Sequence, residues 1–344
     1  MPIFFPTIPE HKNLSLKKWV NENADAKEMK FEILIPDGYE IIKQDNDIPT
    51  VEKTIIDCVF LENKSQTMQI IVQCLFIESE VSLLHYLEYF ANTGNEKIIE
   101  QRCLNNDSDK PDMLLEKIFD DGQTWITRRT AYKRWAGEGA YVIIANVATN
   151  QQLYNQHAQL LFTISNSLKP IGKPEYDKAE RLKLITKRYP LDFATYLPWS
   201  WEDLHHHNDT LQQMNLGYVK KLRGKVTGVF SISSRTWSEE YYEMNDVLKE
   251  MHKPYIDQGA KFQQMVLTKS NSINGINGLM NGTVEFEQEP GNSSKKNNIS
   301  FFIVKKNNAW FYSEIFGPSK ETDFEAWAIN NRAMEIANEN MRIL

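Results

Sequence analysis

The sequence predicts an α+β protein with two tandem lobes, each built from an antiparallel sheet flanked by helices. The first observation is length, because 344 residues exceed the size at which a single hydrophobic core usually stops growing. The second is an internal repeat: "FEILIPDGYE", from Phe31 to Glu40, returns without a gap as "FATYLPWSWE", from Phe193 to Glu202. The third is the order of strand-like and helix-like segments, which is the same after each copy.

The two copies of the repeat share residue types where a strand should end. Pro198 aligns with Pro36, and Trp201 aligns with Tyr39. Proline has no backbone N–H and ends strand pairing, so we expect the aromatic residue beyond it to return the chain to the core. We place the first lobe at residues 1–171, a linker at 172–190 and the second lobe at 191–344.

In the first lobe, β-branched and aromatic runs alternate with turn-forming residues. "TIIDCVFLEN" and "TMQIIVQCLFIES" are expected strands, followed by a helix that starts near Leu83 and ends at "NTG". Four more strands should then form an antiparallel meander, in which Asp121-Gly122 is a hairpin signal. A closing amphipathic helix is expected from about Leu153 to Leu168.

The second lobe repeats this order of elements. "VTGVFSISSRTW" is strand-like, and Thr236 opens a capping box for a helix that Pro254 is expected to end. Four strand candidates follow, and the glycine-rich "NGINGLMNG" among them is expected to be a hairpin loop. A last helix is expected from about Thr322 to the end of the chain.

The composition narrows the class of protein. Hydrophobic residues at 41% and charged residues at 25% are typical of a soluble globular protein. The net charge of −7 opposes binding to nucleic acid. The chain begins without a basic segment and apolar core, and no apolar run is long enough to span a membrane, so we expect a cytoplasmic protein. The three cysteines, Cys58, Cys74 and Cys103, lack Cys-x-x-Cys spacing and are expected to be buried thiols.

The sequence favours a protein without a catalytic residue, a cofactor or a metal. His205, His206 and His207 are adjacent, so their side chains point in different directions, and no ligand pair at metal-site spacing accompanies them. "NGINGLMNG" lacks the Gly-Lys-Ser/Thr ending of a phosphate loop. No Gly-x-Ser-x-Gly elbow is present. We expect no enzyme activity, and a hydrolase with a site between the lobes is the least favoured alternative.

Cations and aromatic residues alternate in "WITRRTAYKRW", from Trp125 to Trp135. This mixture fits an ordinary amphipathic strand, a protein-binding surface or a nucleic-acid site. Large aromatic residues and arginine dominate binding hot spots. The candidate partner contacts are therefore Trp125, Arg129 and Trp135 in the first lobe and Trp199, Trp201 and Trp237 in the second. Core packing is the alternative role for each tryptophan.

The opening pattern F-x-x-x-x-P-x-x-[YW], two strands, a helix, four antiparallel strands and a closing helix resemble the PsbP-like fold. That fold is shared by the photosystem PsbP proteins, a nuclear-import cofactor that binds the Ran GTPase, and Eag-type chaperones of bacterial type VI secretion effectors. The resemblance covers both halves in element order, and the two decapeptides carry it at residue level. It implies tandem PsbP-like lobes that are binding modules rather than catalysts. The duplicated lobe resembles the paired arrangement of Eag-type chaperones, and the absence of a transit peptide argues against the photosynthetic branch.

These observations lead to a functional hypothesis. We expect a cytoplasmic, bacterial protein-binding adaptor or chaperone of a secretion system, whose partner is a secreted effector or a component of the apparatus. An exposed sheet face or the groove between the lobes is expected to bind that partner. The alternative is a structural subunit of a secretion or envelope assembly. The sequence leaves the oligomeric state open.

Overall fold

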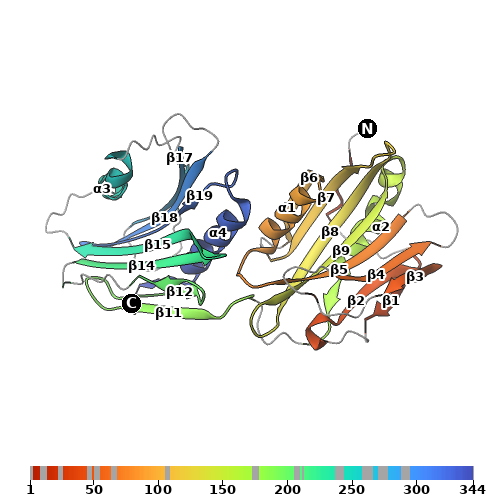
Figure 1. Cartoon of the computed structure of the whole chain (residues 1–344), viewed down its shortest axis with the longest axis horizontal. Coiled ribbons are helices and arrows are strands. Elements are labelled where there is room, and N and C mark those ends of the chain that lie inside the picture. Colours follow the sequence, from red (N-terminus) through yellow and green to blue (C-terminus); the bar gives the residue numbers. More distant parts are fainter. Residues whose placement is uncertain are drawn as a thin grey trace. The chain divides into compact units, whose positions relative to one another are not determined.

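The computed structural model divides the chain into two compact units, Met1–Glu180 and Arg181–Leu344 (Figure 1). Both units are α+β with antiparallel sheets, which confirms the predicted fold class. No helix among the described residues is long and apolar enough to cross a membrane. The residues described are 3–7, 14–21, 26–44, 49, 55–62, 68–104, 109–172, 178–204, 210, 213–236, 244–257, 266–269, 278–287 and 295–343.

The first unit contains a seven-stranded sheet with the order β3-β4-β5-β9-β8-β7-β6 and a three-stranded sheet with the order β1-β2-β10. Strands β6 to β9 are sequential antiparallel neighbours, as expected for a meander. The elements are β1 Leu16–Val20, a 3-10 turn Lys27–Met29, β2 Phe31–Pro36, β3 Tyr39–Gln44, β4 Ile55–Glu62, β5 Met68–Ile77, α1 Leu83–Thr93, β6 Lys97–Cys103, β7 Pro111–Ile118, β8 Thr124–Trp135, β9 Ala140–Asn150, α2 Gln151–Asn166 and β10 Lys169–Pro170.

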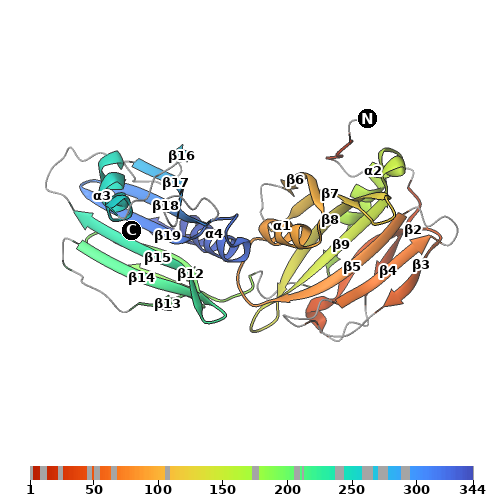
Figure 2. The same ribbon diagram turned by 45° about the horizontal axis from the view of Figure 1, so that its top comes forward.

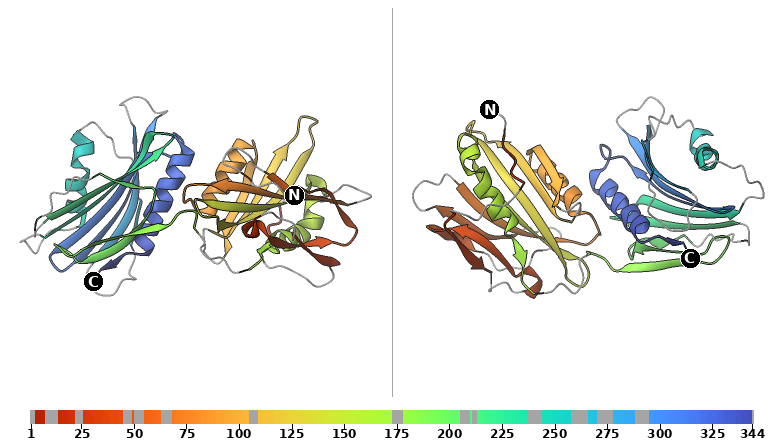
Figure 3. Two further views of the ribbon diagram at one scale, coloured as in Figure 1. Left: turned by 60° about the horizontal axis from the view of Figure 1, so that its bottom comes forward. Right: turned by 180° about the vertical axis from the view of Figure 1, so that it is seen from behind.

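The two helices of the first unit cover opposite faces of the large sheet. Helix α1 packs on β6, β7 and β8, and α2 packs on β8, β9 and β2. Successive residues of a strand point to opposite faces. Accordingly, Arg128 of β8 lies against Phe162 of α2, whereas Arg129 lies against Phe90 of α1. Figure 2 shows α1 on one face of the large sheet. The view from behind in Figure 3 shows α2 in front of the strands, on the other face.

The second unit repeats this architecture. Its large sheet has the order β13-β14-β15-β19-β18-β17-β16 and its small sheet the order β11-β12-β20, so each strand takes the place of one in the first unit. Helix α3 corresponds to α1, and α4 corresponds to α2. The elements are β11 Leu182–Lys187, β12 Phe193–Pro198, β13 Glu202–Asp203, β14 Gln213–Leu222, β15 Lys225–Thr236, α3 Met244–Asp257, β16 Val266–Lys269, β17 Gly278–Glu287, β18 Lys296–Lys306, β19 Ala309–Pro318, α4 Phe324–Glu339 and β20 Arg342–Ile343.

The repeated decapeptide forms the central strand of each small sheet and the turn into the large one. β2 ends at Pro36 and β12 at Pro198. Tyr39 and Trp201, which follow these prolines, are 6% and 0% exposed. The repeat is therefore a folding signature, in which an aromatic side chain is buried directly after the strand ends.

The structure differs from several local predictions. The region expected as a linker contains β11, which pairs with β12 along its whole length and belongs to the second unit. Helix α3 continues past Pro254, whose missing N–H was expected to end it. The sequence "NGINGLMNG" is not wholly a loop, because β17 begins at Gly278 and pairs with β18. Strand β14 was not predicted, and the chain ends with β20 instead of continuing the last helix.

The prediction of buried cysteines is confirmed for Cys74. Cys103 differs from it, because its side chain is only half-buried. The side chain of Cys58 lies outside the described residues.

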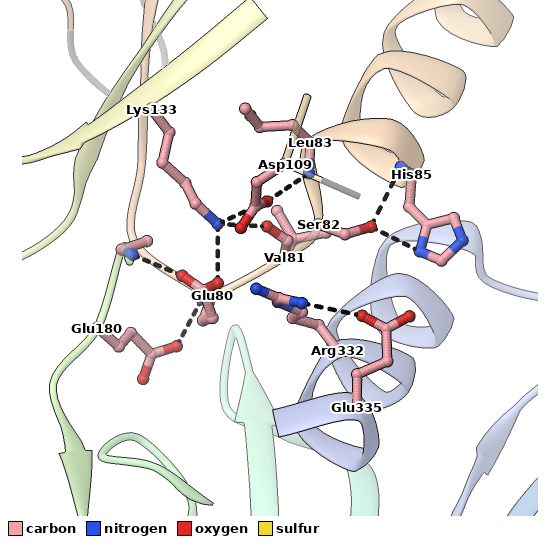
Figure 4. A network of polar contacts seen from close by, with 11 residues as sticks. Glu80, Val81, Ser82, Leu83, His85, Asp109, Lys133, Glu180, Arg332 and Glu335 are labelled. Carbon is pink, nitrogen blue, oxygen red and sulfur yellow. Dashed lines mark hydrogen bonds and ion pairs between the residues drawn. The ribbon is translucent and has the colours of Figure 1, made fainter. Parts of the chain in front are cut away.

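A buried ion pair ties the end of the first unit to its body (Figure 4). The Lys133 ammonium lies 2.8 Å from the Glu80 carboxylate, and both side chains are almost fully buried. Glu80 also accepts a 2.5 Å hydrogen bond from the backbone N–H of Ala179, and its own N–H donates to Glu180 over 2.7 Å. Lys133 further pairs with Asp109 at 3.3 Å. The network fixes residues 179–180 before the second unit begins.

Candidate partner-binding surface

The small sheet of the second unit has one buried face and one exposed face. Alternation along β11 and β12 sends Ile185, Phe193 and Leu197 into the core, where they are 5%, 0% and 0% exposed. The opposite face carries Leu184, which lies across from Tyr196. The fold thus leaves an apolar sheet surface outside the hydrophobic core.

Trp199 follows directly after Pro198, at the end of β12. It is 68% exposed, and Leu184 is 57% exposed. The backbone N–H of Trp199 donates a 2.8 Å hydrogen bond to the carbonyl of Arg181, so the main chain beneath the ring is held in place. We call this surface the outer apolar face; it consists of Leu182, Leu184, Ala194, Tyr196 and Trp199.

The first unit has the same backbone at this place but different chemistry. Leu184 faces Tyr196, whereas Lys18 faces Leu34 at the corresponding positions of β1 and β2. Glu32 replaces Ala194 and forms an ion pair with Lys18. Asp37 replaces Trp199 and accepts a hydrogen bond from the Ser15 hydroxyl. The fold therefore tolerates charged residues on this face.

The apolar residues of the second unit are consequently not required for folding. A large apolar side chain on the surface gains nothing from burial within its own chain, and contiguous exposed apolar area marks interaction sites. β11 is also the edge of its sheet among the described residues, because it pairs only with β12. The outer apolar face is therefore the strongest candidate for a functional surface.

Three arginines lie beside the outer apolar face. Arg181 and Arg188 flank β11 and are exposed, and Arg342 of β20 lies beside Ala194. On the inner side, Lys183 stacks over the ring of Tyr218, 4.9 Å from its centroid, and bonds to the carbonyl of Trp201. The surroundings favour a partner that carries carboxylates beside its apolar side chains.

The other tryptophan predicted in this part of the chain lies inside the protein. Trp201 is fully buried and meets Phe230 edge to face, with ring centroids 6.3 Å apart. Both residues lie in the turn after Pro198, but only Trp201 packs into the hydrophobic core, whereas Trp199 is 68% exposed. The third, Trp237, lies outside the described residues.

The candidates of the first unit share one strand but form no exposed cluster. Arg129 is 3% exposed and pairs with Glu96 at 2.7 Å. It also lies over the ring of Phe90, and burial lowers the pKa of its guanidinium. Trp125 and Trp135 are half-buried at the two ends of β8. Arg129 thus serves the packing of α1 on the sheet.

A hollow in the second unit lies between α3 and the strands beside it. Its volume is about 150 Å³, and its lining includes Asn215, Arg235 and Glu250. Beneath α3, the carboxylate of Glu314 accepts hydrogen bonds from Tyr312 and Tyr255, at 2.6 and 2.8 Å. Burial raises the pKa of Glu314, which keeps this small hydrogen-bonded cluster neutral over a wider pH range.

No metal site is evident in the part of the chain that the structure describes. No group of three His, Cys, Asp or Glu side chains there could hold a metal ion. The adjacent histidines His205, His206 and His207 lie outside the described residues.

Comparison with known proteins gives only distant structural similarities. No family model matches the chain, and no curated protein matches it. The Ran-binding protein Mog1p of Saccharomyces cerevisiae is 12% identical, with a TM-score of 0.32, over 48% of this chain and 96% of its own. Cyanobacterial PsbP from Synechocystis sp. PCC 6803 is 13% identical, with a TM-score of 0.30, over 48% of this chain and 98% of its own.

A third solved structure matches most of the chain. It is the immunity protein TplEi of the Pseudomonas aeruginosa T6SS, complexed with an "L" peptide. It is 10% identical, with a TM-score of 0.26, over 91% of this chain and 95% of its own. Sequence identities and TM-scores this low do not support an inference about function. The fold is assigned from the order of the strands in the two units.

Proposed function

We propose that this protein is a non-catalytic binding protein whose protein partner docks on the outer apolar face of the second unit. The observation that carries the proposal is the contrast between the two copies of one small sheet. Leu184, Tyr196 and Trp199 in the second copy replace Lys18, Leu34 and Asp37 in the first. Because the first copy forms the same sheet with charged residues on this face, the apolar side chains of the second copy are available to bind a partner.

The chemistry of the face defines its partner. An aromatic ring such as that of Trp199 buries roughly 150–250 Å² when it is covered, and tryptophan, tyrosine and arginine dominate hot spots. Arg188 and Arg342 at the rim favour carboxylates around the partner's apolar side chains. Aliphatic Leu184 fits an apolar side chain better than a stacked base, which favours protein over single-stranded nucleic acid.

At a finer level, we propose an adaptor or chaperone of a bacterial secretion system, with a secreted effector as the partner. The order of elements in the two lobes and their resemblance to paired Eag-type chaperones motivate this assignment. A structural subunit of a secretion or envelope assembly is the second candidate. Both would use a protein-binding face and neither needs a catalytic group.

Co-purification tests the proposal. We expect the tagged wild-type chain to retain a partner at fixed stoichiometry and Trp199→Asp, which introduces the residue of the first unit, to lose it. The matched control is Ile118→Asp, because Ile118 is 67% exposed in the other unit. A single retained effector supports a chaperone, and retained apparatus components support a subunit. Equal retention by Trp199→Asp and wild type would overturn the proposal.

A further inference from the structure

A short segment of the first unit covers a pair of buried arginines. Ile3–Thr7, which we call the strap, lies along α2. The backbone N–H of Phe4 donates to Asn155 over 3.3 Å, and Tyr154 donates to the carbonyl of Phe4 over 2.7 Å. The side chains of Ile3 and Phe5 also pack against the hydrophobic core, and Pro6 is buried.

The site beneath the strap contains two guanidinium groups and one carboxylate. Arg128 makes a two-pronged contact with Asp112, with N···O distances of 2.7 and 2.5 Å. Arg102 donates to the same carboxylate over 2.7 Å. Both guanidiniums stack on the ring of Phe5 at 4.2 Å and on that of Phe162 at 5.2 and 4.1 Å. Both guanidinium groups therefore lie close to the rings of Phe5 and Phe162.

Among the described residues, this arrangement leaves one positive charge without a matching anion. Two cations share Asp112, and the second acceptor they share is the neutral carbonyl of Pro6, at 2.5 Å from Arg102 and 3.1 Å from Arg128. Arg128 is fully buried, its Nη1 makes no hydrogen bond of normal geometry among the described residues, and the Tyr154 hydroxyl that interacts with its guanidinium is neutral. A buried cation normally requires a paired charge and complete hydrogen bonding, so the site is short of one negative acceptor.

We propose that this site binds an extended peptide carrying an aromatic residue followed by a carboxylate, and that the strap occupies it in the free protein. Backbone groups of any extended segment can replace those of Phe4, and an aromatic ring can replace that of Phe5. A carboxylate near the position of the Pro6 carbonyl would form charge-assisted bonds, which are stronger than those of a neutral acceptor. The site lies in the first unit and is independent of the outer apolar face.

The strap is attached to the chain, so it competes at a high effective concentration. A peptide in solution should bind the wild-type protein weakly and should bind a chain with a weakened strap more tightly. Phe5→Ala weakens the strap, because it removes the ring that stacks on both arginines. The site itself, with Arg102, Arg128 and Phe162, is unchanged in this variant.

The experiment uses two labelled peptides, acetyl-IFFDT and acetyl-IFFNT, and fluorescence anisotropy with the full chain. We expect Phe5→Ala to bind the aspartate peptide about tenfold more tightly than wild type does, and about tenfold more tightly than the asparagine peptide. Arg102→Gln in the Phe5→Ala background should abolish the preference for aspartate. Arg102 suits this change because its side chain is 22% exposed.

Three outcomes would overturn the proposal. The first is equal binding of the two peptides by Phe5→Ala, and the second is no binding of either. The third concerns folding: if circular dichroism shows Phe5→Ala to be unfolded, a chain lacking residues 1–7 replaces it. Should that chain also be unfolded, the strap is an integral part of the core and cannot be exchanged for a ligand.

Discussion

Asp37 and Trp199 occupy equivalent positions in the two units. Each follows the proline that ends the central strand of a small sheet, and each donates its backbone N–H to the residue before the neighbouring strand. Asp37 donates to Ser15 over 3.0 Å and Trp199 to Arg181 over 2.8 Å. One side chain is an aspartate bonded to Ser15, and the other is a tryptophan that is 68% exposed. The same turn thus presents a charge in one unit and an aromatic ring in the other.

The buried aromatic residues of the repeat should each stabilise their own unit. We expect Tyr39→Ala to destabilise the first unit and Trp201→Ala the second, each by about 3–5 kcal/mol, because loss of a large buried side chain leaves a cavity. Urea denaturation followed by circular dichroism should show one of two transitions shifted in each variant. If Trp201→Ala left stability intact but abolished partner retention, Trp201 would be a binding residue and its assignment to the core would be wrong.

The two units should fold separately when the chain is divided between Glu180 and Arg181. We expect the fragments 1–180 and 181–344 each to unfold cooperatively, because each contains complete sheets and its own helices. A fragment ending at Gly172 should be less stable than 1–180 by about 1–3 kcal/mol, since Glu80 loses the N–H of Ala179. Equal stability of the fragments 1–172 and 1–180 would mean that residues 178–180 contribute nothing to the stability of the first unit.

The buried pair of Lys133 and Glu80 should matter far more than an exposed pair. Lys133→Met leaves the carboxylate of Glu80 buried without its cation, which we expect to destabilise the first unit by about 3–5 kcal/mol. The matched control is Lys97→Met, which breaks the pair with Glu116. Because the Lys97 side chain is 72% exposed, the expected loss is at most about 1 kcal/mol. Similar denaturation midpoints for the two variants would contradict this account of the network.

His252 should make the second unit sensitive to acid. Burial lowers the pKa of His252 from 6.5 to about 4, so the folded state keeps the ring neutral while the unfolded chain takes up a proton. Between pH 6.5 and 4 this proton uptake should cost on the order of 3 kcal/mol of stability. The raised pKa of Glu314 acts in the opposite direction, because its folded state takes up a proton first as the pH falls.

Comparison with His252→Gln isolates the contribution of the histidine. Both chains contain Glu314, so only the slope due to His252 should differ between them. We expect the free energy of unfolding of the second unit to fall less steeply with decreasing pH in the variant. Identical slopes for wild type and variant would show that His252 is not held neutral.

Much of the fold follows from patterns that local chemistry determines. The decapeptide repeat marks the same strand and turn in both units, because proline ends the pairing and the next aromatic residue is buried. Helix α1 begins at Leu83 and is followed by Gly94, as predicted, and the Ser82 side chain caps it by accepting from the N–H of His85. Runs of β-branched and aromatic residues predicted β5, β8 and β9, and the two helices cover both faces of the sheet there.

Tertiary contacts decided the features that local patterns did not reveal. Strand β11 has a charged sequence typical of a linker, yet pairing with β12 makes it a strand. Pro254 lies in the last turn of α3, where its lost hydrogen bond was outweighed by packing. The different exposure of Trp199 and Trp201 depends on the direction in which each side chain points from the turn. The strap over Arg128 brings together residues that are far apart in the chain. Neither relationship has a sequence signal.

Site-specific photo-cross-linking tests most directly whether a partner docks on the outer apolar face. A benzoylphenylalanine placed at position 199 of the full chain, in complex with the partner that it retains, would lie within the proposed interface. The same group at position 37 occupies the equivalent turn of the first unit and serves as the control. We expect a covalent product with the partner from position 199 and none from position 37. Equal yields at both positions, or no product at position 199 while the complex remains intact, would contradict the account.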